Sequence, residues 1–581
     1  MKRIILFSVL AATASAAPVI RSGTSGIVNA ASYIPLGAQG KGIAQGSFFV
    51  IFGSGLGPST IAIASPPFPT STGGTTVTIT PATGSPVSAF LYYALDGQVS
   101  GILPSTTPTG AANVTVTYSG ATSPPVKITV VKSDFGIFTL NQAGSGPAAI
   151  LNRNLDGTSP INSLTASAAP GQILELYGTG LGPITGDDNV APGAVSPAGI
   201  DVKVLVAGQS ITPIYAGRSP AYPGLDQLDF QIAADATVPD SCFVPIAVSV
   251  NGVVSNYATF AKTTTGTTCA APLGLPTATL QKLDAGGKIN VGLLSLSRST
   301  IQASAFGFSV TAATEHGGGT FASLDAAGVF GLIQTPGAIP PLNPPGTCLV
   351  QTQDAITPPP FTVPAVSKPL NAGTKLTLTG PNNKSHDLPP ETGFGYGAFL
   401  AQSGASIAGI SLAGIAGIPK VPDGTPASFL EAGQWTISGA GGSDIGAFTA
   451  TVTVPATLAC QNCTFASIDR TKPLTINWTG GGTQDYAQIG GFATTPSVGD
   501  TSKNVAVVFT CTAKVSDGTF TVPVSILSQL PTSSSDPLAA NTGALAIVNG
   551  SGNAGAGFTA PGIDVGYFGY TSLLFKAMGY N

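Results

Sequence analysis

Two cysteines in the sequence Cys-Gln-Asn-Cys, Cys460 and Cys463, have the spacing of a redox-active dithiol or of half a zinc site. A redox C-x-x-C motif needs a helix N-terminus to stabilise its thiolate, whereas the flanking sequence alternates like a strand. A zinc site needs two further ligands, for which Cys348 and Cys511 are candidates. We therefore favour structural disulfides, in which the two cysteines pair either with each other or with the two distant ones.

Acid–base or nucleophilic catalysis has few candidate side chains. The only histidines, His316 and His386, lie in polar segments rich in glycine or proline, and no G-x-S-x-G turn of a serine hydrolase is present. A glycosidase can act with two carboxylates alone, but no spacing singles out a pair. We therefore expect surface imidazoles, no catalytic residue, no metal and no cofactor. The carboxylates considered are Glu315, Asp325, Glu391 and Glu431.

Two acidic segments resemble parts of cation sites. Residues 152–157, "NRNLDG", match the first half of a calcium loop, but the twelfth position is Ser163 instead of a bidentate glutamate. Asp156-Gly157 is by itself a good tight-turn pair. Residues 186–189, "GDDN", hold a carboxylate pair, for which we expect a solvated loop.

Glycine-rich turns recur along the chain. Residues 53–58, "GSGLGP", return as "GTGLGP" at 178–183. A phosphate-binding loop needs a lysine and a following helix, and neither turn has them. Both are interpreted as structural turns in which glycine supplies positive φ. Residues 550–555, "GSGNAG", satisfy G-x-G-x-x-G, but a proline and no helical pattern follow, which favours a hairpin loop.

Aromatic side chains are the remaining candidates for ligand contact. Trp435 and Trp478 could stack on sugar rings, but both lie inside alternating strand-like segments, a pattern that favours core or inter-sheet tryptophans. The adjacent pair Tyr92-Tyr93 is a further candidate for an aromatic platform.

The composition indicates a folded chain with few charges. Of 581 residues, 8% are charged, against about 25% in typical proteins, while 43% are hydrophobic. The formal charge of −4 provides no basic stripe, which argues against nucleic acid or an anionic membrane as a partner.

The N-terminus predicts export. Lys2 and Arg3 precede an apolar run at 4–12 and the small residues Ala-Ser-Ala at 14–16, the order of a secretory signal peptide. No later segment has the length of a membrane span; the best, 405–419, is short, glycine-rich and ended by proline. We expect a secreted protein, extracellular or at the cell surface, with the periplasm as an alternative.

Export favours oxidised cysteines. The chain has an even number, and Cys242 with Cys269 is the first expected pair because both flank the end of one predicted domain. All six are predicted to be in disulfides: Cys242, Cys269, Cys348, Cys460, Cys463 and Cys511.

Short alternating runs with turn residues between them predict an all-β protein of tandem immunoglobulin-like β-sandwiches. An internal repeat marks two modules, because 46–53 matches 171–178 and 114–123 matches 246–255. The predicted organisation is a signal peptide at 1–16, immunoglobulin-like modules at 17–140 and 141–262, a Thr-rich linker at 263–276, a β-rich region at 277–345, a sandwich at 346–454 and a C-terminal sandwich at 455–581.

The repeated motifs resemble an uncharacterised module family of exported acidobacterial proteins, whose sandwiches are similar to IPT/TIG immunoglobulin-like domains. The motifs are "GIVNAASY" at 26–33, "GSFFVIFGSGLGP" at 46–58, "GPAAILNRNLDGTSPIN" at 146–162, "GQILELYGTGLGP" at 171–183 and "GLDQLDFQI" at 224–232. The first module departs from the pattern, since "DGQVSGILP" is a weaker form of the glutamine-centred strand. The resemblance implies fold and export and supplies no catalytic residues.

These observations favour an exported, non-enzymatic protein with a structural, adhesive or ligand-presenting role. Stacked sandwiches would form a stiff rod whose loops, including 156–162 and 178–189, meet a partner. Polysaccharide or cell-envelope components are the expected partners. The alternatives are a polysaccharide-binding protein and a divergent secreted carbohydrate-active hydrolase. The sequence leaves the oligomeric state open.

Overall fold

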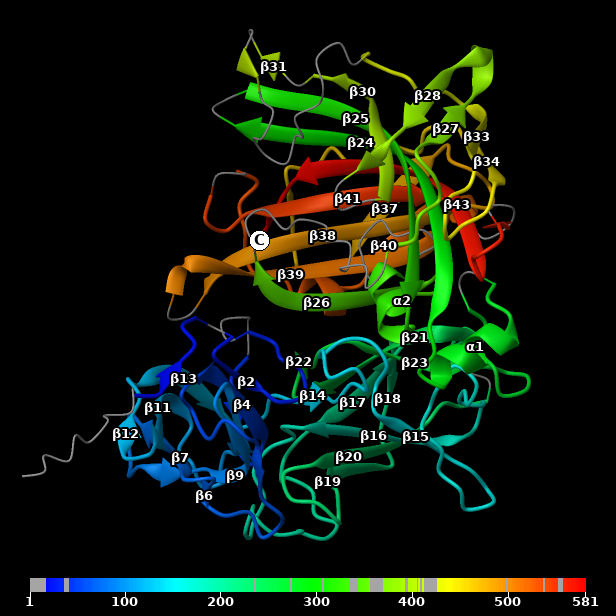
Figure 1. Cartoon of the computed structure of the whole chain (residues 1–581). Helices are drawn as coiled ribbons and strands as arrows, with labels where there is room; N and C mark the ends of the chain where they lie inside the picture. The colour runs from blue at the N-terminus through cyan, green and yellow to red at the C-terminus, as the bar shows by residue number, and fades with distance from the viewer. Residues whose placement is uncertain are drawn as a thin grey trace, which may run out of the picture.

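In the computed structural model, the regular secondary structure is almost entirely β-strand (Figure 1). It describes residues 17–23, 25–35, 41–234, 237–271, 274–305, 308–333, 343–355, 369–391, 395–404, 406–407, 410–411, 426–497, 500–536, 539–551 and 557–581. The predicted signal peptide at 1–16 and most of 405–419 and 550–555 lie outside these ranges. The fold is all-β, with tandem immunoglobulin-like sandwiches. The α-helices are short: α1 (Thr277–Asp284), α2 (Ala326–Ile333) and α3 (Val524–Leu527).

The first module is a sandwich of two sheets. One contains, in spatial order, β1 (Val19–Ile20), β4 (Phe48–Ser54), β10 (Gln98–Ile102), β9 (Phe90–Leu95) and β5 (Ala62–Ile63), with β2 (Ile27–Asn29) beside β4. The other contains β3 (Ile43–Ala44), β13 (Val126–Val131), β11 (Gly110–Tyr118), β7 (Thr75–Pro81) and β6 (Ser71–Thr72), with β12 (Ala121–Thr122) beside β11 and β8 (Val87–Ser88) beside β7. Alternate residues such as Phe49 and Ile51 of β4, and Val114 and Val116 of β11, form its core.

The second module repeats this plan. One sheet contains β14 (Gly136–Ile137), β16 (Ile173–Thr179), β20 (Asp226–Gln231) and β19 (Tyr215–Arg218), with β15 (Ile150–Arg153) beside β16. The other contains β18 (Gln209–Ile211), β17 (Val202–Val206), β21 (Ser241–Val250) and β22 (Val253–Val254), with β23 (Ala258–Lys262) beside β21. The two modules meet between Val131 and Gly136, a few residues before the predicted boundary at 140, because β14 already pairs with β16.

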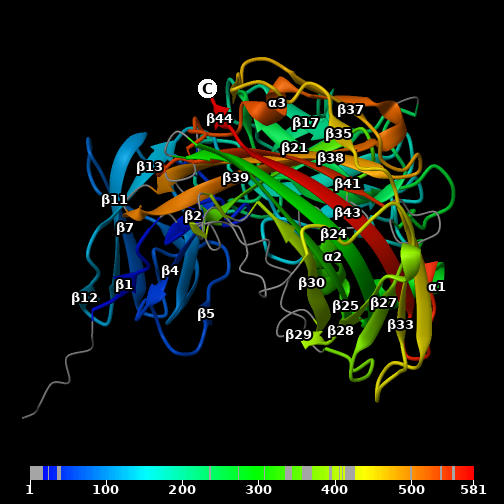
Figure 2. The ribbon, with the colours of Figure 1, turned by 90° about the horizontal axis from the view of Figure 1, so that it is seen from above.

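The C-terminal half is organised around one ten-stranded sheet. Its spatial order is β26 (Thr347–Ala355), β39 (Asp500–Lys514), β38 (Tyr486–Ser497), β41 (Gly543–Gly550), β43 (Val565–Ala577), β24 (Ile289–Ala305), β25 (Phe308–Leu324), β30 (Gly395–Ser403) and β29 (Pro390–Glu391), with β42 (Gly557–Phe558) beside β43. Figure 2 shows this sheet as one twisted surface. It takes strands from 277–345, 346–454 and 455–581, so the expected boundaries at 345 and 455 do not separate independent sandwiches. Long-range pairing joins these segments, and local sequence patterns do not reveal it.

Smaller sheets pack on one face of this large sheet. One contains β28 (Ser385–Leu388), β27 (Leu376–Thr379), β33 (Gly433–Gly439) and β34 (Phe448–Val454), and another β35 (Ala459–Cys460), β37 (Leu474–Thr479) and β40 (Thr519–Val522). Two short pairs are β31 (Ser406–Ile407) with β32 (Ile410–Ser411) and β36 (Ser467–Ile468) with β44 (Gly579–Tyr580). The sheet of β27, β28, β33 and β34 closes an apolar core around Leu294 and Phe568. The sheet of β35, β37 and β40 closes another around Ile489 and Phe509.

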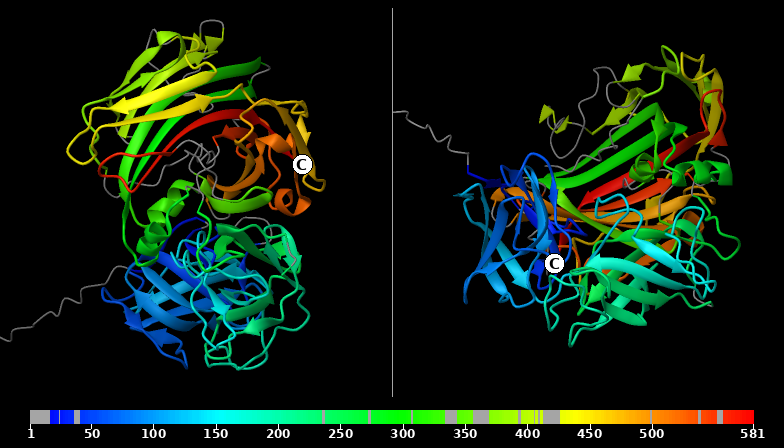
Figure 3. Two further views of the ribbon diagram at one scale, coloured as in Figure 1. Left: turned by 90° about the vertical axis from the view of Figure 1, so that its right-hand side faces the viewer. Right: turned by 60° about the horizontal axis from the view of Figure 1, so that its bottom comes forward.

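The modules lie side by side beneath the large sheet, in blue and in cyan to green (Figures 1 and 3). This arrangement differs from the expected end-to-end rod. Lys41 of the first module forms an ion pair with Asp134 at 2.9 Å and donates to the carbonyl of Val254 in the second at 2.6 Å. Leu164 of the second module shares an apolar cluster with Ile289 of the large sheet. Packing between units therefore sets the overall shape.

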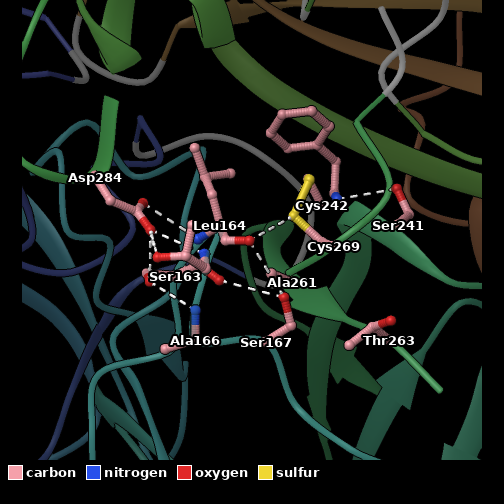
Figure 4. Close-up of a disulfide and its surroundings, with 12 residues drawn as sticks. Ser163, Leu164, Ala166, Ser167, Ser241, Cys242, Ala261, Thr263, Cys269 and Asp284 are labelled. Carbon is pink, nitrogen blue, oxygen red and sulfur yellow. Dashed lines mark hydrogen bonds between the residues drawn. A yellow bond between two sulfur atoms is a disulfide. The ribbon is translucent and has the colours of Figure 1, made fainter. Parts of the chain in front are cut away.

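The segment predicted as a Thr-rich linker is anchored by a disulfide within it and by the helix that follows it. Cys242 and Cys269 form a disulfide whose sulfur atoms lie in the cluster between the second module and the large sheet (Figure 4). The carboxylate of Asp284, the last residue of α1, accepts bonds from the hydroxyl of Ser163 at 2.9 Å and from the backbone N–H of Thr165 at 2.9 Å (Figure 4). These contacts fix α1 against the second module.

Candidate functional site

The outer face of one first-module sheet carries a row of aromatic side chains, named here the aromatic strip: Tyr33, Phe52, Tyr92 and Tyr93. Phe49 and Ile51 of β4 point into the core, so strand alternation turns Phe52 outward. Tyr33 follows β2 in a turn, where its backbone has a positive φ of 52°. The rings of Tyr33 and Phe52 are 6.3 Å apart.

A β-bulge brings two consecutive tyrosines to the same face. The register of β9 against β10 shifts between Ser100 and Gly101, which leaves Tyr92 as the extra residue of β9. Strict alternation would have sent Tyr92 and Tyr93 to opposite faces. Instead their rings lie 5.3 Å apart, and the ring of Tyr92 lies 6.1 Å from that of Phe48, another outward residue of β4.

One end of the strip is closed and the other is open. At the closed end, Phe68 packs between Tyr92 and Tyr222, the latter from the second module, with ring distances of 5.7 and 5.8 Å. At the open end the strip residues are half-buried, and Ile63 beside them on β5 is 63% exposed. The open end therefore presents ring surface to solvent on a rigid sheet.

The hydroxyl of Tyr93 keeps its proton at physiological pH. Burial raises the pKa of Tyr93 to about 12, with smaller contributions from Tyr33 and Tyr92. Its hydroxyl accepts a bond from the side-chain amide of Gln98 at 2.6 Å. The guanidinium of Arg21 lies 5.1 Å from the centre of the Phe52 ring, a cation–π distance. The strip thus combines ring surface with hydroxyl and amide groups.

A cleft of about 580 Å³ adjoins the strip where the two modules meet the large sheet. Tyr33 belongs to both the strip and the cleft wall. We name this feature the junction cleft. Its lining residues include Tyr33 and Lys41 of the first module, Ser145 and Tyr257 of the second, and Gln351, Thr352, Gln353, Ser528 and Gln529 of the C-terminal half.

The structure confirms the core positions favoured for the two tryptophans and excludes them as ligand-stacking residues. Trp435 is 0% exposed and Trp478 is 3% exposed, so neither offers a ring face to a ligand. Both are core residues whose indole N–H groups donate to the backbone carbonyls of Glu431 and Val515. The inward positions of β33 and β37 account for this burial.

The histidines do not form a hydrolase triad among the described residues. His316 Nε2 lies 3.3 Å from Glu391 Oε2, and the imidazole packs on Phe399 at 5.4 Å. Ser297 lies opposite His316 on β24, whereas the imidazole extends toward Gly397 on β30. His386 is half-buried, with its ring 5.9 Å from that of Phe429 and Nδ1 2.7 Å from the carbonyl oxygen of Asp387.

The other candidate carboxylates have structural partners. Glu315 pairs with Arg298 and accepts the backbone N–H groups of Phe429 and Leu430, both at 2.7 Å. Asp325 accepts the N–H of Gly328 at the start of α2. Hydrogen bonds from Lys384 and Asn382 lower the pKa of Glu431. In the part of the chain that the structure describes, no three histidine, cysteine or acidic side chains cluster as metal ligands.

The acidic loops have structural roles. Asp156 Oδ1 accepts the backbone N–H and the hydroxyl of Thr158, which closes a turn, and Asn152 is buried against Asn162. The expectation of a solvated loop at 186–189 is confirmed for Asp187, which is exposed. It is wrong for Asp188, which is 6% exposed and accepts both the N–H and the hydroxyl of Ser105 in the first module. The loop at 178–189 therefore binds the neighbouring module.

The repeated glycine turn is a structural device. The carboxylate of Asp226 accepts the N–H groups of Gly180 and Leu181 at 2.7 and 2.8 Å, so a protein side chain occupies the place of an anion. Gly180 has a φ of 110° and Gly182 one of 135°, values that side-chain-bearing residues rarely adopt.

All six cysteines are in disulfides. The pairs are Cys242–Cys269, Cys348–Cys511 and Cys460–Cys463, so the C-x-x-C pair is a local bridge and the zinc and dithiol alternatives do not arise. Cys348 and Cys511 lie directly opposite each other on β26 and β39.

Sequence reasoning missed Tyr33 and Phe52 as members of the site. The alternation in "GSFFVIFG" could have placed Phe48 and Phe52 together on the face opposite Phe49 and Ile51. No local signal places Tyr33 beside them, because it arrives through the pairing of β2 with β4.

Fold and site define a disulfide-bonded, all-β protein with tandem immunoglobulin-like sandwiches. No family model and no curated protein matches the chain. Among solved structures it is similar to a Bacteroides ovatus mixed-linkage glucan utilization locus protein, SGBP-B, in complex with a heptasaccharide (10% identity, 86% of this chain and 97% of that chain, TM-score 0.12). It is also similar to Sidekick-1 immunoglobulin domains 1–4 (10%, 93% and 97%, TM-score 0.11) and to the BSP domain of a biofilm associated protein (8%, 94% and 99%, TM-score 0.12). These low identities and TM-scores establish no shared function. Across the described residues, the helices are too short to cross a membrane.

Proposed function

We propose that this is an exported, non-enzymatic protein that binds an uncharged polysaccharide along the aromatic strip, outside the cell or at its surface. The carrying observation is the set of half-buried rings on the outer face of one rigid sheet, in which Tyr33 packs on Phe52 and Tyr92 packs on Tyr93. Flat rings bury the apolar faces of sugars, while nearby hydroxyl and amide groups bond to sugar hydroxyls. Membership of the acidobacterial module family is part of the proposal.

Charge and redox chemistry support this choice of ligand and compartment. The strip holds one cation, Arg21, which faces Phe52, and the net charge of the chain is −4, so a polyanionic glycan has little to pair with. Three disulfides are typical of an oxidising compartment. A purely structural or adhesive role gives no reason for the β-bulge that brings Tyr92 and Tyr93 to the same face of the sheet.

The test is a pull-down of the mature protein on insoluble cellulose, xylan, chitin, starch and mannan, with released sugars assayed in the same tubes. Tyr93→Ala is expected to weaken binding about thirtyfold, since a central aromatic contact contributes about 2 kcal/mol. Tyr118→Ala, a half-buried tyrosine on the opposite sheet of the same module, is the control and should bind like the wild type. Equal binding by both variants, or release of sugars, would reject the proposal.

Binding is expected to be independent of pH between about 5 and 9. The pKa of Tyr93 is raised to about 12, so its phenol keeps its proton throughout this range and remains a hydrogen-bond donor. Above about pH 11 the phenolate begins to form and binding should fall. Affinity measured across this range by titration calorimetry checks the prediction, and a midpoint near pH 6 would point to a histidine elsewhere.

A further inference from the structure

The junction cleft has the chemistry of a sugar subsite. Its volume of about 580 Å³ falls within the roughly 300–1,000 Å³ of small-molecule sites. Hydroxyl and amide side chains from all three units converge on it, and two tyrosines, Tyr33 and Tyr257, contribute ring surface. This mixture of polar groups and rings suits a ligand that carries many hydroxyls and apolar ring faces.

The charges of the cleft are already neutralised. Lys41 is bound to Asp134 at 2.9 Å and to the carbonyl of Val254 at 2.6 Å. No carboxylate occurs among the described residues that line the cleft. A charged ligand would therefore be buried without an ionic partner, which costs free energy, whereas an uncharged ligand avoids that cost.

One wall offers hydrogen-bonding groups that the protein leaves unused. Gln351, Thr352 and Gln353 lie on β26, and their side chains make no hydrogen bond within the described part of the chain. β26 is also the terminal strand of the ten-stranded sheet, so its outer edge keeps backbone groups without a strand partner. Both features leave donors and acceptors facing the cleft for a ligand to bind.

The cleft is continuous with the aromatic strip through Tyr33, whose ring lies 6.3 Å from Phe52 and also lines the cleft. We propose that the junction cleft is a second subsite, which binds a short segment of the same uncharged polysaccharide that lies on the strip. This inference rests on the proposed function. Because the cleft wall comes from three units, bound sugar would also hold the modules and the large sheet together.

The test compares uncharged trisaccharides with the corresponding polymers. Cellotriose, xylotriose, chitotriose, maltotriose and mannotriose are titrated into the full mature protein by calorimetry. At least one should bind, and the double variant Gln351→Leu/Gln353→Leu should weaken it about tenfold or more, while the control Tyr118→Ala on the opposite sheet changes it less than threefold. Polymer binding should be weakened more by Tyr93→Ala than by the double variant.

A second variant covers the case in which the leucines disturb β26. Ser528→Trp places a bulky side chain in the cleft from an exposed position after α3 and should also abolish trisaccharide binding. Polymer binding without any trisaccharide binding, or trisaccharide binding that neither cleft variant alters, would overturn the subsite and leave the strip proposal standing. Absence of binding to every polymer and trisaccharide would overturn both.

Discussion

Replacing Asp226 by asparagine is expected to lower the free energy of unfolding of the two-module unit by about 3–5 kcal/mol, because it strands a buried cation. Arg218 is 1% exposed, and its guanidinium forms an ion pair with Asp226, which is 0% exposed. The same guanidinium donates to the carbonyls of Gly46 in the first module and Gly182 in the second, at 3.0 and 2.8 Å. Asparagine has nearly the same shape as aspartate but no charge, so the expected loss of stability is electrostatic.

The control removes both charges. Arg218→Met/Asp226→Asn should recover much of the loss, since it leaves no unpaired ion and the asparagine oxygen can still accept the N–H groups of Gly180 and Leu181. Both tryptophans, Trp435 and Trp478, lie in the C-terminal half, so far-UV circular dichroism must report the modules while tryptophan fluorescence reports the large sheet. A single variant that loses less than about 1 kcal/mol would show that the carboxylate is not what holds the turn and the module interface.

The two modules could be predicted from the sequence because the patterns that define them are local along the chain. Period-2 runs define strands, and the repeated glycine turn has the same position after β4 and β16. The group that the turn binds could not be predicted. Asp226 lies on β20, 46 residues after Gly180 and 45 after Leu181, and only tertiary packing places its carboxylate on their N–H groups.

The large sheet and the candidate site depend on non-local pairing. β24 pairs in parallel with β43, so that Val291 lies opposite Val565, and nothing in either segment specifies that partner. The same limit applies to the aromatic residues. A strand pattern shows that Trp435 and Tyr93 each lie on one face, but which face is covered depends on sheets formed elsewhere, and the bulge at Tyr92 breaks the alternation itself.

The disulfides should differ in importance according to the loops they close. With sequence separations of 163, 27 and 3 residues, the chain-entropy relation gives about 5, 3.5 and 1.5 kcal/mol for Cys348–Cys511, Cys242–Cys269 and Cys460–Cys463. Cys348→Ala/Cys511→Ala is therefore expected to destabilise the C-terminal half most. Both cysteines are also buried beside Phe509 in the core that contains Trp478, so a packing loss adds to the entropic one.

Denaturant unfolding followed by tryptophan fluorescence measures this effect where it arises, since Trp478 belongs to the same core as Cys348 and Cys511. The matched control is Cys460→Ala/Cys463→Ala, which removes the same number of sulfur atoms from the edge of that core but opens a loop of only 3 residues. The long-range pair joins β26 to β39, and its loss would free the strand that forms one wall of the junction cleft. The Cys348→Ala/Cys511→Ala variant should therefore lose trisaccharide binding at denaturant concentrations at which the Cys460→Ala/Cys463→Ala variant still binds fully. If both double variants unfold at the same denaturant concentration, the strand pairing alone holds β26 in place and the disulfide adds nothing to it.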